Sequence, residues 1–138
     1  MNVKKIGCLL LAILCLNFGI LNKAEAAITP ERIGGFTRYD TSVLICKNGW
    51  QQNSDYAVIV SGQDFQGALC AIPLAKKYKA PVLLTSKDKS DNPLQWINLN
   101  KELYRLKVKK VFLIGGEDSI SSAIEHEFMD KEIETTRI

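Results

Sequence analysis

Two arginines near residue 35 are the first side chains whose type and spacing indicate binding chemistry. Arg32 and Arg38 flank the pair Gly34-Gly35, and glycine allows backbone conformations that other residues avoid. Each arginine carries a planar, charged group that matches the geometry of phosphate or carboxylate. The stretch therefore predicts an anion contact, while an ordinary turn leading into a helix fits the same residues.

Two polar turns follow segments that are expected to be buried strands. Ser61-Gly62-Gln63-Asp64 comes directly after one, and Gly115-Gly116-Glu117-Asp118 ends another. Open α/β sheets bind ligands at the carboxyl ends of their strands, so these turns occupy favourable positions. Neither turn has the Gly-x-Gly-x-x-Gly or Gly-Lys-Ser/Thr pattern of a nucleotide site, and a sharp strand-to-helix connection also explains the second one.

Catalytic chemistry has little support in the sequence. His126 is the single histidine and lies among acidic residues, and Ser61 lacks the Gly-x-Ser-x-Gly surroundings of a nucleophile. Asp64, Glu117 and Asp118 could hold a cation only if the fold brought them together. We therefore predict no catalytic residue, no metal and no cofactor.

Cys46 and Cys70 fall on two different expected helices, at no metal-ligand spacing. We predict two buried free thiols, with a disulfide as the alternative, because a disulfide needs its two Cα atoms within bonding range.

The elements that must position these residues alternate between two hydrophobic periodicities. Short aliphatic runs bounded by turn residues predict strands, and apolar residues spaced by three or four predict helices, such as Leu69, Ile72 and Ala75 or Ile97, Leu103 and Leu106. Asp64 and Ser121 are expected helix caps. This alternation predicts an α/β domain, a small doubly wound (Rossmann-like), mainly parallel sheet flanked by helices. The expected strands are 56–60, 81–85, 108–114 and a short one near Ile133; the expected helices are 41–50, 64–78, 93–106 and 122–130.

The first 26 residues have the pattern of an export signal. A lysine-containing start precedes an apolar run over 6–21, and Ala24-Glu25-Ala26 forms a small-x-small cleavage site. The run is shorter than the roughly 20 residues of a membrane-spanning helix, and Leu14 before Cys15 argues against a lipoprotein. We predict cleavage after residue 26, secretion, and one domain over 27–138.

Charge is unevenly distributed along the predicted mature chain. Residues 76–110 hold ten Lys or Arg against three acidic residues, whereas 111–138 hold two against seven. Such asymmetry suggests a basic face that could meet a polyanion, although solvated helix faces give the same pattern.

The order of several short blocks resembles a known family, the type 2 cell wall-binding repeat of Gram-positive surface proteins. The resemblance spans nearly all of 27–138. The blocks are Arg-Ile-Gly-Gly-Phe-Thr-Arg-Tyr-Asp-Thr at 32–41, Val-Ile-Val-Ser-Gly-Gln-Asp-Phe at 58–65, Ala-Pro-Val-Leu-Leu-Thr at 80–85, Leu-Lys-Val-Lys-Lys-Val-Phe-Leu-Ile-Gly-Gly at 106–116, and Thr-Arg-Ile at 136–138.

The resemblance implies non-covalent attachment to anionic, teichoic-acid-like secondary polymers of the cell wall, with no role in nucleic-acid binding. It places the segment Pro81-Val82-Leu83-Leu84 in the region linked to binding. With the basic residues, the expected contacts are Arg32, Arg38, Pro81, Val82, Leu83, Leu84, Lys107, Lys109 and Lys110.

Copy number and one residue depart from the family pattern. These repeats generally occur three in tandem, in a pseudo-threefold unit, and this chain has one, so other copies in a trimeric arrangement are expected partners. Gly67 stands where the family usually has Asp. The recurrence of Arg-Ile at 32–33 and 137–138 suggests that 135–138 begin a truncated next repeat.

Three hypotheses follow for function. The leading one is a non-catalytic module that anchors a secreted protein to the cell wall. The second is a structural repeat that assembles into a surface layer, and the third, with least support, is a small secreted enzyme acting on the wall.

Overall fold

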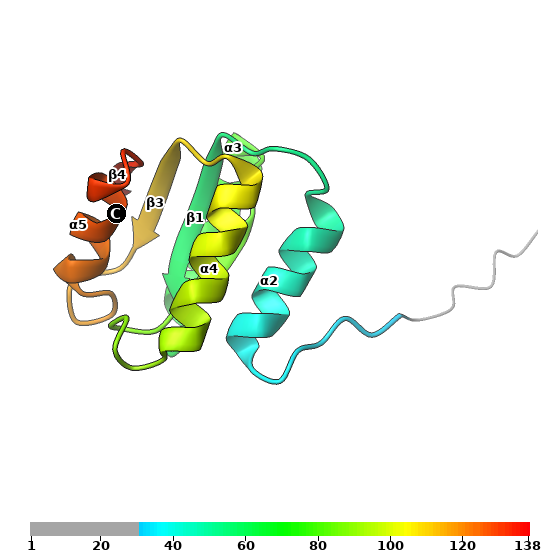
Figure 1. Ribbon diagram of the computed structural model, residues 1–138, viewed down its shortest axis with the longest axis horizontal. Coiled ribbons are helices and arrows are strands. Elements are labelled where there is room, and N and C mark those ends of the chain that lie inside the picture. The colour runs from blue at the N-terminus through cyan, green and yellow to red at the C-terminus, as the bar shows by residue number, and fades with distance from the viewer. Residues whose placement is uncertain (1–30) are drawn as a thin grey trace, which may run out of the picture. The chain divides into compact units, whose positions relative to one another are not determined.

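The computed structural model describes residues 31–138, so the predicted signal peptide lies outside the described residues. Four helices alternate with four strands along this part of the chain (Figure 1). Among residues 31–138 no helix is long and apolar enough to cross a membrane. The elements are α2 (Arg38–Gly49), β1 (Tyr56–Ser61), α3 (Phe65–Tyr78), β2 (Val82–Thr85), α4 (Pro93–Leu106), β3 (Lys110–Ile114), α5 (Ser122–Asp130) and β4 (Glu134–Arg137).

The four strands form one sheet in the order β2-β1-β3-β4, and every pairing is parallel. Val58 of β1 lies opposite Val82 on one side and Phe112 on the other. The predicted Rossmann-like α/β fold is confirmed. Residues 134–137 complete this sheet, since Thr136 of β4 pairs with Phe112 of β3.

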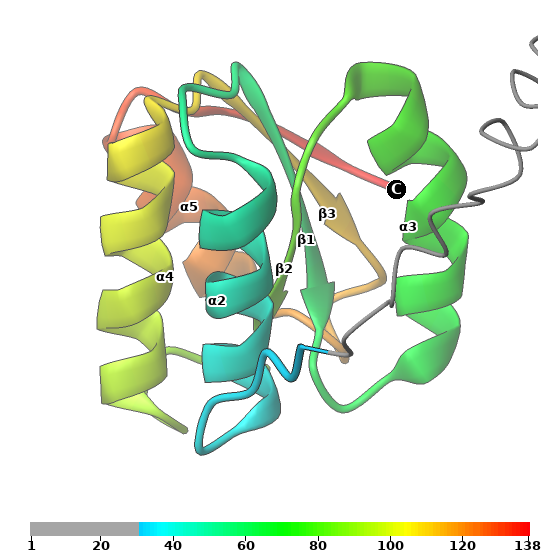
Figure 2. The same cartoon turned by 90° about the vertical axis from the view of Figure 1, so that its right-hand side faces the viewer.

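Helices cover both faces of the sheet, as continuous apolar strands require. Helices α2, α4 and α5 lie on one side and α3 lies alone on the other (Figure 2). Alternate residues of β1 point to opposite faces of the sheet. Ile59 packs in the cluster beneath α2, α4 and α5, whereas Val58 and Val60 pack beneath α3. Burial on both faces explains why β1, β2 and β3 are mostly apolar, whereas the edge strand β4, which is only partly buried, consists of polar residues.

Side-chain caps mark the first residues of α2, α3 and α4. Thr37 and Asp40 form a capping box, in which the Asp40 amide donates to Thr37 Oγ1 and the Thr37 amide donates to Asp40 Oδ2, both at 3.2 Å. Helix α2 therefore begins at Arg38, three residues before the predicted start. Asp64 caps α3 as predicted, accepting from the Gln66 amide at 2.9 Å. Ser121 occupies the cap position of α5, but its side chain makes no capping hydrogen bond.

The predicted apolar stripes of α3 and α4 are partly wrong. Leu69 and Ile72 are 60% and 58% exposed, and α3 faces the sheet with Ala71 and Ala75 instead. These small residues lie against the strands, and of the larger side chains of α3 Leu74 and Tyr78 pack against the same cluster while Leu69 and Ile72 remain outside. On α4, Ile97 is exposed, and the buried residues of the stripe are Trp96, Leu99, Leu103 and Leu106.

The prediction of two buried thiols is half right. Both cysteines are free, but Cys46 is buried on the inner face of α2 and Cys70 is exposed on α3. Burial, followed by the hydrogen bond to Glu102 and its charge, raises the pKa of Cys46 to about 12. Because the thiolate is the reactive form, Cys46 is inert.

Candidate functional site

Arg38, the first residue of α2, lies at the carboxyl end of β1. Arg38 Nη1 donates to the Gly62 carbonyl at 2.7 Å, which ties the start of α2 to the turn after β1. The Tyr39 ring packs so closely against this turn that a Cβ at Gly62 would lie 2.3 Å from it. Gly62 is therefore required for close approach, and both Arg38 and Arg32 remain exposed.

The lysines predicted as contacts lie at the opposite end of the sheet. Lys110 begins β3 and lies opposite Tyr56, the first residue of β1, whereas Gly62 follows the last residue of β1. A strand rises roughly 3.3 Å per residue, so the two ends of β1 are about 15–20 Å apart. The predicted contacts therefore form two separate groups, not one site.

Two of these lysines are engaged in ion pairs on the surface. Lys109 Nζ lies 2.8 Å from Asp55 Oδ1, and the hydrogen bond to Asp55 and its charge raise the pKa of Lys109. Lys110 pairs with Glu134 of β4. Within residues 31–138, Lys107 is in no ion pair, so it is the lysine of the three with an uncompensated charge.

The segment Pro81-Val82-Leu83-Leu84 forms the edge strand β2 and its entry. Pro81 and Leu83 are buried, so neither is placed to touch a polymer directly, and Val82 and Leu84 are partly buried. The outer edge at Leu84 is closed by side chains: its amide donates to Ser42 Oγ, and its carbonyl accepts from Gln95 Nε2, both at 3.2 Å. These caps block pairing of a further strand at this position.

An apolar groove runs beside β2, between α2 and α3. It has a volume of about 530 Å³. Ile45 on α2 and Ile72 on α3 are half exposed above it. Its lining residues are Ile45, Cys46, Trp50, Ile72, Ala75, Lys76, Lys79, Ala80 and Val82.

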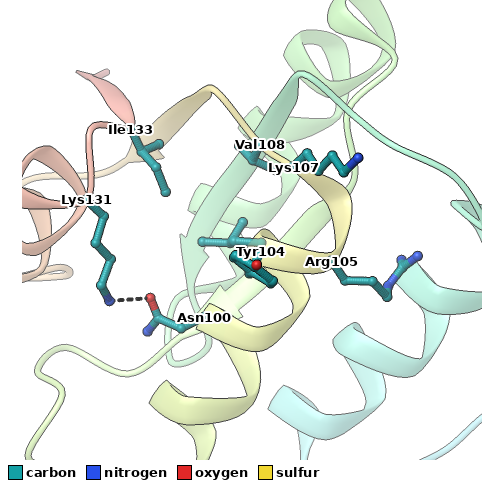
Figure 3. A pocket seen from close by; sticks show the side chains of 8 residues that line it. Asn100, Tyr104, Arg105, Lys107, Val108, Lys131 and Ile133 are labelled. Carbon is teal, nitrogen blue, oxygen red and sulfur yellow. Dashed lines mark hydrogen bonds between the residues drawn. The ribbon is translucent and has the colours of Figure 1, made fainter.

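A second groove, which we call the α4–α5 groove, lies between the carboxyl-terminal half of α4 and the segment after α5 (Figure 3). Its volume is about 520 Å³. Of the residues that line this groove, only Lys107 was predicted as a contact from the sequence. The others were missed because they come from two segments that are distant in the sequence. The lining residues are Asn100, Leu103, Tyr104, Arg105, Lys107, Val108, Lys131 and Ile133.

The polar residues considered for catalysis do not form a cluster, and one of them, Asp64, is a helix cap. Asp64 caps α3, and His126 is exposed on α5. No group of three or more His, Cys, Asp or Glu side chains in the described part of the chain could hold a metal ion. A Cβ at Gly67 would lie 3.4 Å from Asp64 Oδ2, so an aspartate at this position would place a second carboxylate beside the cap of α3.

The described residues thus form a small doubly wound α/β module whose recesses are shallow surface grooves. The chain belongs to the family "Cell wall binding domain 2 (CWB2)", whose family model matches residues 32–125. The resemblance found in the sequence is therefore confirmed.

Relatives from Bacillus subtilis (strain 168) show the same relationship. The chain is 33% identical to "N-acetylmuramoyl-L-alanine amidase LytC" over 115 residues, which is 83% of this chain and 22% of that protein. It is 32% identical to "Amidase enhancer" over 102 residues, 74% of this chain and 14% of that protein. The chain thus spans less than a quarter of either relative.

Two solved structures from Clostridium difficile are also similar. Cwp6 matches with a TM-score of 0.66 and 30% identity, over 84% of this chain and 19% of that one. Cwp8 matches with a TM-score of 0.67 over 99% of this chain and 23% of that one, and at 21% identity it supports the fold alone. A cell wall-binding domain implies a location at the cell surface.

Proposed function

We propose that this chain is a secreted, non-catalytic module that anchors a protein non-covalently to anionic secondary polymers of the cell wall. The observation that carries the proposal is the CWB2 match over residues 32–125, which includes most of the described fold. The amidase among its relatives is more than four times as long as the matched region, so the match concerns a binding module and not the whole enzyme.

The charges on the surface support an electrostatic mode of binding. The proposed polymer contacts remain Arg38 at the carboxyl end of β1, the exposed Arg32 before α2, and Lys107, Lys109 and Lys110 at the other end of the sheet. Val82 and Leu84 would contribute from the edge strand, which the buried Pro81 and Leu83 hold in place. Exposed ion pairs contribute only about 0–1 kcal/mol each, but a long polymer could engage both ends of the sheet.

The proposal predicts that the purified chain sediments with Gram-positive wall sacculi. The bound fraction should fall as salt rises from 0.1 M to 1 M, because the Debye length shortens from about 10 Å to about 3 Å. Sacculi stripped of secondary polymers by acid serve as the control and should retain little protein. Equal binding to stripped sacculi would contradict a polymer target and indicate the peptidoglycan itself.

Self-association into a surface assembly is a second candidate, and the apolar groove beside β2 favours it. Half-exposed isoleucines on two helices border this groove, and a second copy would cover them. Trimeric packing of copies, which the family resemblance implies, would also raise avidity for a polymer by roughly 10² to 10⁴.

Sedimentation velocity tests this candidate. We expect a concentration-dependent oligomer that Ile72→Glu disrupts, because the added charge would be buried at the contact. Ile97→Glu is the matched control, since Ile97 is a similarly exposed isoleucine on α4 outside the groove. A wild-type chain that stays monomeric at all accessible concentrations would remove self-association through this surface.

A further inference from the structure

We propose that the α4–α5 groove is a subsite for one anionic sugar residue, with the sugar ring against Tyr104 and its phosphate or carboxylate near Lys107 and Lys131. The inference deepens the proposed function and rests on it for the identity of the natural polymer. The groove's volume of about 520 Å³ lies within the roughly 300–1,000 Å³ of small-molecule sites.

The aromatic ring of Tyr104 is the first observation. Its side chain is 87% exposed, although its neighbour Leu103 is buried in the core. Buried or partly buried apolar side chains line the groove next to it, namely Leu103, Val108 and Ile133. A sugar ring presents a C–H face and a hydroxyl edge, which suits an open groove that combines an aromatic ring with an apolar floor.

Two lysines from different parts of the fold supply the positive charge. Lys107 ends α4 and Lys131 follows α5, and both line the groove, with the Lys107 side chain extending away from Lys131 (Figure 3). Lys131 Nζ donates to Asn100 Oδ1 at 2.7 Å and lies 3.1 Å from Glu127 Oε1. Asn100 is therefore a positioning residue, which holds the ammonium group at the edge of the groove.

Lys131 lies among acidic residues, with Asp130 and Glu132 as its neighbours in the chain and Glu127 as its ion-pair partner. Glu127 also pairs with Lys89 at 2.8 Å, so one carboxylate is shared by two ammonium groups. Hydrogen bonds from Lys89 and then Lys131 lower the pKa of Glu127. Within residues 31–138 Lys107 is in no ion pair, so its charge is the one available to an anion at the groove.

A lysine at the end of a helix also has a structural explanation, because cations there interact favourably with the helix dipole. The chain contains its own control for this effect. Lys79 ends α3 in the same left-handed conformation as Lys107 ends α4, with φ of 50° and 56°. Lys79→Gln and Lys107→Gln therefore remove the same charge from equivalent backbone positions, and only the second lies in the α4–α5 groove.

The test is an NMR titration of the full chain with α-D-glucose 1-phosphate, compared with glucuronate, glucose and inorganic phosphate. We expect the two anionic sugars to shift amide signals around Tyr104, Lys107 and Lys131, and glucose and phosphate alone to bind at least tenfold more weakly. Comparison of the two anionic sugars separates phosphate from carboxylate as the source of charge. Tyr104→Ala should weaken binding about tenfold, equivalent to ~1.4 kcal/mol, and Lys107→Gln about two- to fivefold, with Lys79→Gln unchanged.

The same variants in the sacculus assay separate this inference from the proposed function. Suppose that the wild-type chain binds sacculi and that the Tyr104→Ala and Lys107→Gln variants bind them equally well. The groove is then not a subsite, and the proposal of wall binding is retained. If anionic sugars shift the groove signals but sacculi are not bound, the subsite stands and wall anchoring falls. Equal shifts with inorganic phosphate and with glucose 1-phosphate would overturn the role of the sugar ring.

Discussion

Replacing Arg137 with methionine is expected to lower the free energy of unfolding by about 3 kcal/mol, because the side chain links three elements at one point. Arg137 Nε donates to Glu125 Oε2 at 2.9 Å, and Nη1 donates to the carbonyls of Gly115 and Ile120 at 2.9 and 3.0 Å. Nη2 lies 2.8 Å from Glu125 without an aligned hydrogen bond. The variant would leave a mostly buried carboxylate and two carbonyls without this donor.

Urea denaturation followed by circular dichroism measures this effect as a shift of the midpoint at constant slope. Arg32→Met is the matched control, because Arg32 belongs to the other Arg-Ile pair and is exposed. Its change should stay within about 0.5 kcal/mol. Similar losses for the two variants would show that the hydrogen bonds of Arg137 do not stabilise the edge formed by β4 and α5.

Replacing Arg105 with methionine is expected to destabilise the protein by about 3 kcal/mol at pH 7, because it removes the partner of a buried carboxylate. The Glu102 side chain is 1% exposed, and Arg105 binds it through two hydrogen bonds, of 2.6 and 3.0 Å. Arg105 Nη2 also donates to the Trp50 carbonyl at 2.7 Å. The pair thus connects α4 to the end of α2.

The pH dependence of this effect follows from the pKa of Glu102. Burial raises that pKa, but hydrogen bonds from Arg105 and Cys46, with the charge of Arg105, outweigh burial and lower it. In the wild type the pair therefore stabilises the fold above the unfolded pKa, and the contribution is lost as pH falls through the folded pKa. Without Arg105 burial dominates and raises the pKa, so the deficit of the variant should shrink as the pH is lowered toward 4.

Denaturation curves at pH 7 and pH 4 test this, with Glu102→Met/Arg105→Met as the second variant. Replacing both charges with apolar side chains of similar length should recover most of the lost stability. A single variant with the same deficit at both pH values would contradict the role of the carboxylate charge. A double variant as unstable as the single one would assign the loss to packing and to the Trp50 contact.

Local sequence was sufficient to place most elements because strands and helices here differ in hydrophobic period. The aliphatic run after Asp55 and the one before Gly115 could only be buried strands, and Asp64 identified the start of α3 through its own side chain. The predictions that failed were the first residue of α2 and the buried face of α3. The capping box of Thr37 and Asp40 was not recognised. The stripe predicted for α3 was right for Ala75 and wrong for Leu69 and Ile72, because Ala71, Leu74 and Tyr78 contact the sheet in their place.

The sequence by itself determined the fold class and the family, since both depend on the order of short blocks along the chain. The tertiary structure decided which charges meet. Parallel strands carry their starts to one end of the sheet and their exits to the other, which separates Arg38 from Lys110. The chain segment after α5 brings Lys131 beside Asn100 of α4 and places Arg137 against two carbonyls of the connection between β3 and α5. Such contacts depend on packing between elements, and local periodicity contains no information about which elements become neighbours.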